Sequence, residues 1–123
     1  MFPYADQPED YWTGYFSSRA DKKEEDRIAQ ANLHASNKIF AEQAICQTTD
    51  DATISSILDA KFGMFDAMGI MQHHDAITGT AKQAVADNYS KHIQTAMTAS
   101  NNLLVQFIGG RALADTGLPA DGW

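Results

Sequence analysis

Two adjacent histidines and an acid form the part of the sequence best suited to chemistry. His73, His74 and Asp75 lie inside the stretch MQHHDAITGTAKQ, residues 71–83. Imidazole nitrogens and carboxylate oxygens are ligands for zinc, which takes about four of them. Successive residues at a helix end point roughly 100° apart, so we expect the two imidazoles to diverge rather than hold one ion together. One of them could bind a metal with ligands supplied from elsewhere.

The other two histidines do not complete such a site. His34 and His92 lie far along the chain and lack a second histidine at the four-residue spacing of helix-borne zinc pairs. We therefore expect no complete zinc site inside this chain. Spacing alone also allows a second interpretation, in which the histidine pair interacts with the last carbonyls of a helix and Asp75 forms a turn.

Acidic and aromatic residues near the start of the chain suggest sugar chemistry by type. Asp6, Glu9 and Asp10 are carboxylates, and glycoside hydrolysis uses two such groups. Trp12 lies among tyrosines and could present a flat platform to a sugar ring. Surface acids and packed aromatic clusters are the commoner explanations for such residues, so their types alone favour these over a sugar site.

Three segments with helical periodicity must position these groups. Apolar residues recur at three-, four- and seven-residue steps, and few glycines or prolines interrupt them. Glycine weakens a helix by up to about 1 kcal/mol against alanine, so Gly63 and Gly69 do not overturn the second segment. The pattern predicts helices over about 21–47, 51–72 and 81–108.

The expected helix ends carry recognisable signals. Asp50 or Asp51 is placed to cap the second helix through its side-chain oxygen. Thr80 and Gln83 have the spacing of a capping box at the start of the third helix. Gly109–Gly110 is expected to end that helix, since glycine is common just past a helix C-terminus.

The predicted fold is therefore all-α, a single domain over residues 1–123 built as an antiparallel three-helix bundle. An irregular, aromatic-rich segment precedes the helices, and a turn-rich tail follows them. The histidine pair falls at the joint between the second and third helices.

Composition excludes some functions and bounds others. Nine basic and 16 acidic residues give a formal charge of −7, which would repel a phosphate backbone, so nucleic acid is not an expected partner. No apolar run approaches the roughly 18 residues of a membrane span. Cys46 is the only cysteine, flanked by apolar residues, and is expected to be buried and unpaired.

Two features bear on the route of the chain through the cell. The first residues, MFPYADQPED, lack the basic and apolar regions of a secretory signal. Asn88-Tyr89-Ser90 matches the acceptor pattern for N-glycosylation, which carries weight only in a chain that enters the secretory pathway. A chance match on a polar helix face is the alternative.

Two long stretches resemble a known family. FPYADQPEDYWTGYFSSR, residues 2–19, and GIMQHHDAITGTAKQAVADNYSKHI, residues 69–93, resemble two blocks of the glycoside hydrolase family 38 α-mannosidases, the lysosomal and Golgi class. The resemblance covers roughly residues 2–93, in the same order and with similar spacing.

The resemblance implies a retaining, zinc-dependent enzyme that removes terminal mannose from glycans. It implies that His74 is a zinc ligand and that Asp75 contacts sugar hydroxyls. It also implies that Trp12 flanks the bound mannose and that Asp6 contacts substrate. His73 is given no metal bond by the resemblance. A lysosomal or Golgi location follows from it as well.

The departures from the family are as informative. The nucleophile, the acid/base and the remaining zinc ligands belong to an N-terminal domain of the family that is absent from these 123 residues, so no catalytic residue is assigned here. A C-terminal β-rich part is absent too. The resemblance thus implies the helical middle domain, with an incomplete zinc site and no activity of its own. The alternative is a non-catalytic binding or structural module derived from such a bundle, supported by the divergent sequence after about Ser100.

Overall fold

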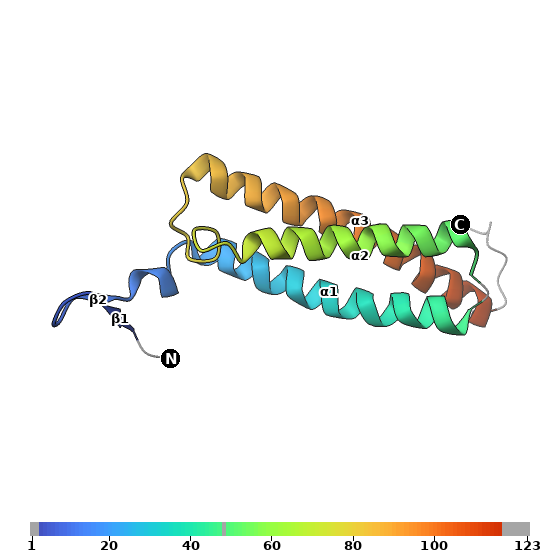
Figure 1. The fold of residues 1–123 in the computed structure, drawn as a ribbon. Coiled ribbons are helices and arrows are strands. Elements are labelled where there is room, and N and C mark those ends of the chain that lie inside the picture. The colour runs from blue at the N-terminus through green and yellow to red at the C-terminus, as the bar shows by residue number, and fades with distance from the viewer. Residues whose placement is uncertain (1–2, 48, 117–123) are drawn as a thin grey trace.

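The structure, a computed structural model, describes residues 3–47 and 49–116 of the chain, with side chains through residue 110. Three long helices run side by side, α1 (Ala20–Cys46), α2 (Asp51–Met71) and α3 (Gln83–Thr116) (Figure 1). Each helix packs on the other two. The predicted all-α three-helix bundle is confirmed.

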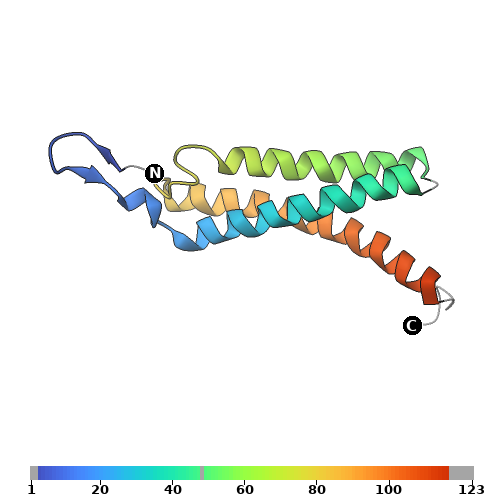
Figure 2. The ribbon, with the colours of Figure 1, turned by 90° about the horizontal axis from the view of Figure 1, so that it is seen from below.

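The N-terminal segment is more regular than expected. β1 (Tyr4–Ala5) pairs antiparallel with β2 (Tyr11–Trp12), in the register Tyr4 to Trp12, and a 3-10 turn η1 (Gly14–Phe16) follows. This hairpin extends beyond the end of the helices, close to the connection between α2 and α3 (Figures 1 and 2). The histidine pair and the aromatic segment therefore lie at the same end of the molecule.

The bundle core consists of two clusters along its length. The cluster nearer the hairpin contains α2 methionines, Ile93 of α3 and Ala29 of α1. Its buried members are Ala29, Met64, Ala67, Met68, Met71, Ala76 and Ile93. The second cluster contains Phe40, Ile57, Ala60 and Leu104. Because Ala76 belongs to the first cluster, the connection after α2 is packed into the core.

One residue of α1 that was predicted to be buried lies at the surface. Cys46, expected to be buried, is exposed, and it is the last residue of α1. Ala29, Ser36 and Phe40 are the buried residues of this helix. Ala29 and Ser36 are small, which lets the other helices approach closely, whereas Ile45 beside Cys46 is 81% exposed.

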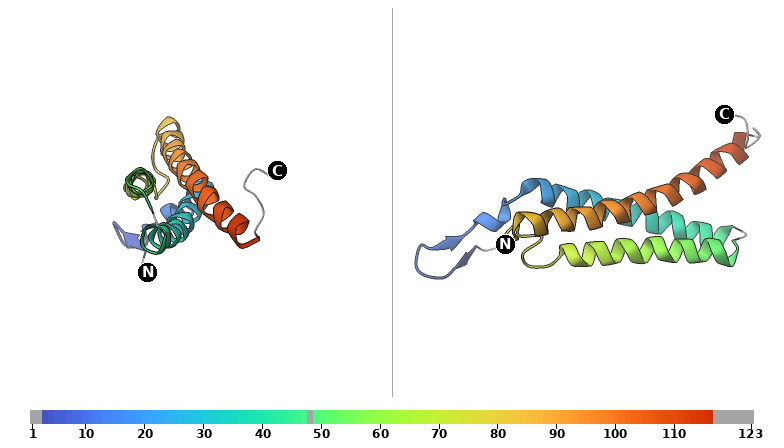
Figure 3. Two further views of the ribbon diagram at one scale, coloured as in Figure 1. Left: turned by 90° about the vertical axis from the view of Figure 1, so that its right-hand side faces the viewer. Right: turned by 90° about the horizontal axis from the view of Figure 1, so that it is seen from above.

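The third helix does not stop where glycine suggested. It continues through Gly109 and Gly110 to Thr116, and Figures 2 and 3 show its C-terminal part diverging from the other two helices. Among the described glycines only Gly79 has a positive φ, so neither Gly109 nor Gly110 adopts the left-handed conformation of a C-terminal cap. The helix includes the first part of the predicted tail, and residues 117–123 lie outside the described part of the chain.

None of the helices within the described residues combines the length and apolarity that a membrane span needs.

The start of α2 gives a prediction about pH. Asp50 caps the helix as expected, because its Oδ1 accepts a 2.7 Å hydrogen bond from the Thr53 backbone N–H. Hydrogen bonds from the Thr53 side chain and backbone lower the pKa of Asp50. A carboxylate with a lowered folded pKa stabilises the protein above its unfolded pKa of about 4, and this stabilisation is lost as pH falls through the folded value.

We therefore expect Asp50→Ala to lower the melting temperature at neutral pH, with the difference from wild type shrinking below pH of about 4. Thermal unfolding followed by circular dichroism at several pH values measures this. Asp50→Asn is the control, since it keeps a capping oxygen without a titrating charge. A difference for Asp50→Ala that is constant across pH would contradict the role of the carboxylate.

Candidate metal and sugar site

The connection between α2 and α3, residues 72–82, forms a compact turn that we call the HHD loop. The backbone N–H of His73 donates to the Ile70 carbonyl, so the chain leaves α2 without a break. The N–H groups of Ala76 and Ile77 then both donate to the His73 carbonyl, at 2.9 and 3.2 Å. These bonds fold the chain into a tight turn directly after α2, which brings His73, His74 and Asp75 together.

The two imidazoles stack instead of diverging. Their ring centroids lie 4.3 Å apart with 26° between the ring planes. The expectation that adjacent histidines point apart is wrong, because His73 and His74 follow the end of α2 and are not held to helical geometry. The Nδ1 of His73 accepts a 3.0 Å hydrogen bond from the Asp75 backbone N–H, which fixes this ring beside the acid.

The Asp75 carboxylate is held by a threonine. The Thr80 hydroxyl donates to Asp75 Oδ1 at 2.7 Å, and it lies 3.0 Å from the Thr78 hydroxyl. The second oxygen, Oδ2, lies 3.6 Å from Nε2 of His74. One carboxylate oxygen is therefore held within the loop, and the other faces the histidine.

This use of Thr80 replaces the predicted capping box. α3 begins at Gln83, and the Gln83 side chain donates to Asp87 at 2.8 Å. The backbone carbonyl of Lys82 accepts the first helical hydrogen bonds, from Val85 and Ala86. The spacing was right for a cap, but the stronger partner for the Thr80 hydroxyl is the Asp75 carboxylate.

Two basic residues at the start of α1 bind the loop, the N-cap residue Arg19 and Lys23 in the first turns of the helix. Arg19 Nη1 donates to the Ala81 carbonyl at 2.5 Å, and its Nη2 lies 3.4 Å from the Gln83 side-chain oxygen. Lys23 Nζ donates to the carbonyls of Ser18 and Ile77, at 2.5 and 2.8 Å. We call Arg19 and Lys23 the anchor residues of the HHD loop.

The sequence did not predict the anchor residues. They lie 54 to 62 positions from the carbonyls that they bind in the HHD loop. The only signal was that Arg19 ends the first of the two resembling stretches. The positive charge of Arg19 alone gave no reason to expect a hydrogen bond to the Ala81 carbonyl.

A glycine allows the close approach of loop and N-terminal segment. Gly79 has φ +77°, and a Cβ placed on it would lie 2.6 Å from the Ser18 carbonyl oxygen. Only glycine fits this conformation and this contact without strain. Gly79 therefore belongs to the structural support of the site.

Charged groups beside the loop have shifted pKa values. Burial lowers the pKa of the Lys23 ammonium, and the nearby Arg27 adds to the effect. Burial raises the pKa of the Asp26 carboxyl, opposed by a hydrogen bond from Gln72 and by Arg27. The Gln72 amide donates to Asp26 at 3.0 Å and ties the first residue of the HHD loop to α1.

The remaining predicted site residues lie on the hairpin. Asp6 is in its turn, where its backbone N–H donates to the Asp10 carbonyl at 3.3 Å. Trp12 is on β2 and is 53% exposed. Its ring meets that of Tyr4 edge-on, with the two ring centroids 5.3 Å apart. The structure thus joins His74 and Asp75 directly and places Asp6 and Trp12 on a separate element at the same end of the bundle (Figure 1).

The histidine pair and the acid fit a metal ion in part. One ligand atom from each of His73, His74 and Asp75 lies within 4.8 Å of the others, the single such group among the residues that the structure describes. The side chain of His74 is 85% exposed, so its donor nitrogen can reach a ligand set beyond this chain. Three donors are fewer than the roughly four that zinc takes, so further ligands are needed.

The family follows from comparison with known sequences. Residues 10–109 match the family model described as the α-mannosidase middle domain. The match covers His74, Asp75, Trp12 and both anchor residues. The chain belongs to the α-mannosidase middle-domain family.

Curated α-mannosidases agree over most of the chain. A lysosomal α-mannosidase of Cavia porcellus is 39% identical over 94 residues, 76% of this chain. One of Dictyostelium discoideum is 35% identical over 109 residues, or 89%. The human protein named α-mannosidase 2 is 37% identical over 115 residues, or 91%.

The α-mannosidases that match are much longer than this chain. It spans 9% of the Cavia porcellus protein, 11% of the Dictyostelium discoideum protein and 10% of human α-mannosidase 2. The middle domain is therefore one segment of a larger enzyme in these relatives, and the resemblance drawn from the sequence is confirmed.

Proposed function

We propose that this chain is the middle segment of a zinc-dependent, retaining α-mannosidase that removes terminal mannose from glycans. The observation that supports this best is the pairing of His74 with Asp75 on a loop that lies within the family match. His74 is the zinc ligand in this proposal. Asp75, Trp12 and Asp6 contact the sugar.

Three of these side chains have surroundings that support the proposed tasks. The exposed imidazole of His74 offers a nitrogen to the metal, and zinc, when bound, supplies a Lewis acid that orients sugar hydroxyls. Thr80 holds Oδ1 of Asp75, and Oδ2, which lies 3.6 Å from Nε2 of His74, can also accept from a sugar hydroxyl. The exposed Trp12 ring offers an apolar face to the sugar ring.

The rest of the reaction belongs to other parts of the proposed enzyme. A retaining glycosidase needs a nucleophile and an acid/base about 5 Å apart, and we assign neither to this chain. The N-terminal catalytic and C-terminal β-rich parts of the parent enzyme are its proposed partners. The isolated chain is then inactive and binds zinc weakly, because metal affinity depends on a complete ligand set.

The proposed enzyme works in the lysosome or the Golgi. Several matching relatives are named lysosomal α-mannosidases. This location supplies mannose-containing glycans as substrates.

A chimeric enzyme tests the proposal. The matching segment of human lysosomal α-mannosidase, which is 35% identical over 99 residues, is replaced by this chain. We expect the secreted chimera to hydrolyse a chromogenic α-mannoside and to contain zinc by elemental analysis. His74→Ala in the chimera should remove turnover and lower the zinc content.

His34→Ala is the matched control, because His34 is an exposed histidine on α1 outside the metal group. It should keep both turnover and zinc. A folded, secreted chimera without turnover would refute the proposal and favour a non-catalytic module. Unchanged zinc content in His74→Ala would refute the assigned ligand.

A further inference from the structure

The acceptor pattern Asn88-Tyr89-Ser90 plays no part in the proposed site. It is the one such pattern in the 123-residue sequence, and it lies near the start of α3. Asn88 is exposed, whereas Ser90 is buried. The two residues that a glycan-transferring enzyme reads together are thus in different environments in the folded protein.

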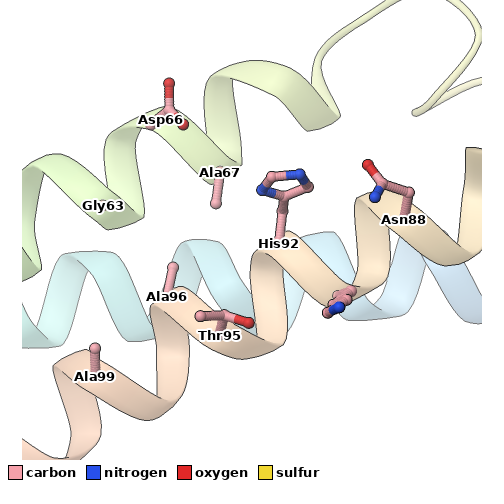
Figure 4. A pocket seen from close by; sticks show the side chains of 9 residues that line it. Gly63, Asp66, Ala67, Asn88, His92, Thr95, Ala96 and Ala99 are labelled. Atoms are coloured by element: carbon pink, nitrogen blue, oxygen red, sulfur yellow. The ribbon is translucent and has the colours of Figure 1, made fainter.

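The surroundings of Asn88 can accommodate a sugar. Its side chain lines an open groove of about 470 Å³ between α2 and α3. Figure 4 shows Asn88 and His92 rising from α3 on the side of α2, with the small residues Gly63 and Ala67 opposite. A sugar on the Asn88 amide would lie over this groove in contact with solvent, without displacing a core side chain.

The surroundings of Ser90 restrict when modification can happen. Its side chain is 6% exposed, and its hydroxyl donates to Glu25 Oε2 of α1 at 2.6 Å. The Glu25 carboxylate also accepts from Gln94 at 2.9 Å. The hydroxyl is therefore engaged once α3 packs on α1, and the transferase can read it only before that packing.

We propose that Asn88 carries an N-linked glycan, attached before α3 docks on α1, and that the groove between α2 and α3 faces solvent in the mature enzyme. In the transfer, Asn88 Nδ2 forms a bond to the anomeric carbon of a lipid-linked oligosaccharide. The lipid pyrophosphate leaves, and the amide loses one proton. The inference rests on the secretory route of the proposed function, but its test needs no mannosidase activity.

Translation in the presence of microsomes tests the site. The full chain is made behind a cleavable secretion leader, with a second acceptor pattern added after residue 123 to report entry into the lumen. We expect two glycans on the chain, both removed by an N-glycosidase. Asn88→Gln should leave one, and Asn102→Gln, an exposed asparagine of α3 outside any acceptor pattern, should leave two.

Two substitutions of Ser90 test whether its hydroxyl is needed for the glycan on Asn88. Ser90→Ala should remove the Asn88 glycan, and Ser90→Thr should retain it, because both serine and threonine are read by the transferase. Chains that carry the reporter glycan but none at Asn88 would overturn the proposal. This result would leave the proposed mannosidase function untouched, since that function depends on His74 and Asp75.

The timing is tested with purified transferase and a lipid-linked oligosaccharide. A peptide of residues 84–94 should be modified, whereas the folded, unmodified chain should not. Equal modification of the peptide and the folded chain would overturn the claim that docking of α3 closes the site.

Discussion

Gly79→Ala will lower the free energy of unfolding by about 2–5 kcal/mol. Two costs add at this residue. Gly79 has φ +77°, a conformation that costs an L-residue roughly 1–2 kcal/mol. Its new Cβ would lie 2.6 Å from the Ser18 backbone oxygen, so the HHD loop or the N-terminal segment must shift. Denaturant unfolding of the purified chain measures the change.

The matched control is the same substitution in a helix. Gly69 is in α2, and a Cβ added there meets nothing within 4 Å. Gly69→Ala should stabilise the protein by up to about 1 kcal/mol, because alanine is the better helix former. Equal effects of the two substitutions would show that the conformation of Gly79 is not what the structure describes.

Ile93→Ala will lower the free energy of unfolding by about 2–5 kcal/mol, an effect comparable to that of Gly79→Ala. Ile93 is 1% exposed and packs with Met64, Met68 and Met71 in the cluster beneath the HHD loop. Removing its outer carbons loses transfer free energy and leaves a cavity that the surrounding helices fill only in part. Because whole domains are stable by about 5–15 kcal/mol, a large share of the total would be lost.

Two further variants keep this result interpretable. Ile93→Val should cost only about 0.5–1.5 kcal/mol and remain folded if the alanine variant does not. Ile45→Ala makes the same chemical change at an 81% exposed position and should stay within about 0.5 kcal/mol of wild type. A loss at Ile45 as large as at Ile93 would contradict the assigned core.

The helices could be predicted from the sequence because their signal is local. Periodic apolar residues predicted the bounds of α1 and α2 to within one residue, and the Asp50 cap marked the start of α2. The predicted end of α3 at Gly109–Gly110 was wrong because glycine permits a left-handed cap without requiring one. The predicted burial of Cys46 was wrong because this residue ends α1, where the neighbouring Ile45 is exposed too.

The site was predictable only where long stretches resembled the α-mannosidases. That resemblance pointed to His74 and Asp75, and the structure places them side by side. Stacking of His73 on His74, and the bond from Thr80 to Asp75, depend on the path of the HHD loop. That path is set by contacts with residues more than fifty positions away, which no local pattern contains.

The anchor residues also bear on which part of the protein unfolds first. Arg19 and Lys23 bind loop carbonyls 62 and 54 positions away, so these bonds exist only when the start of α1 is docked against the HHD loop. These bonds are only partly buried, and local opening can break such contacts while the helices persist. The protein can then lose the arrangement of His74 and Asp75 at a temperature where it is still helical. Heat would then separate the side chains of the candidate site by opening this joint, before the bundle unfolds.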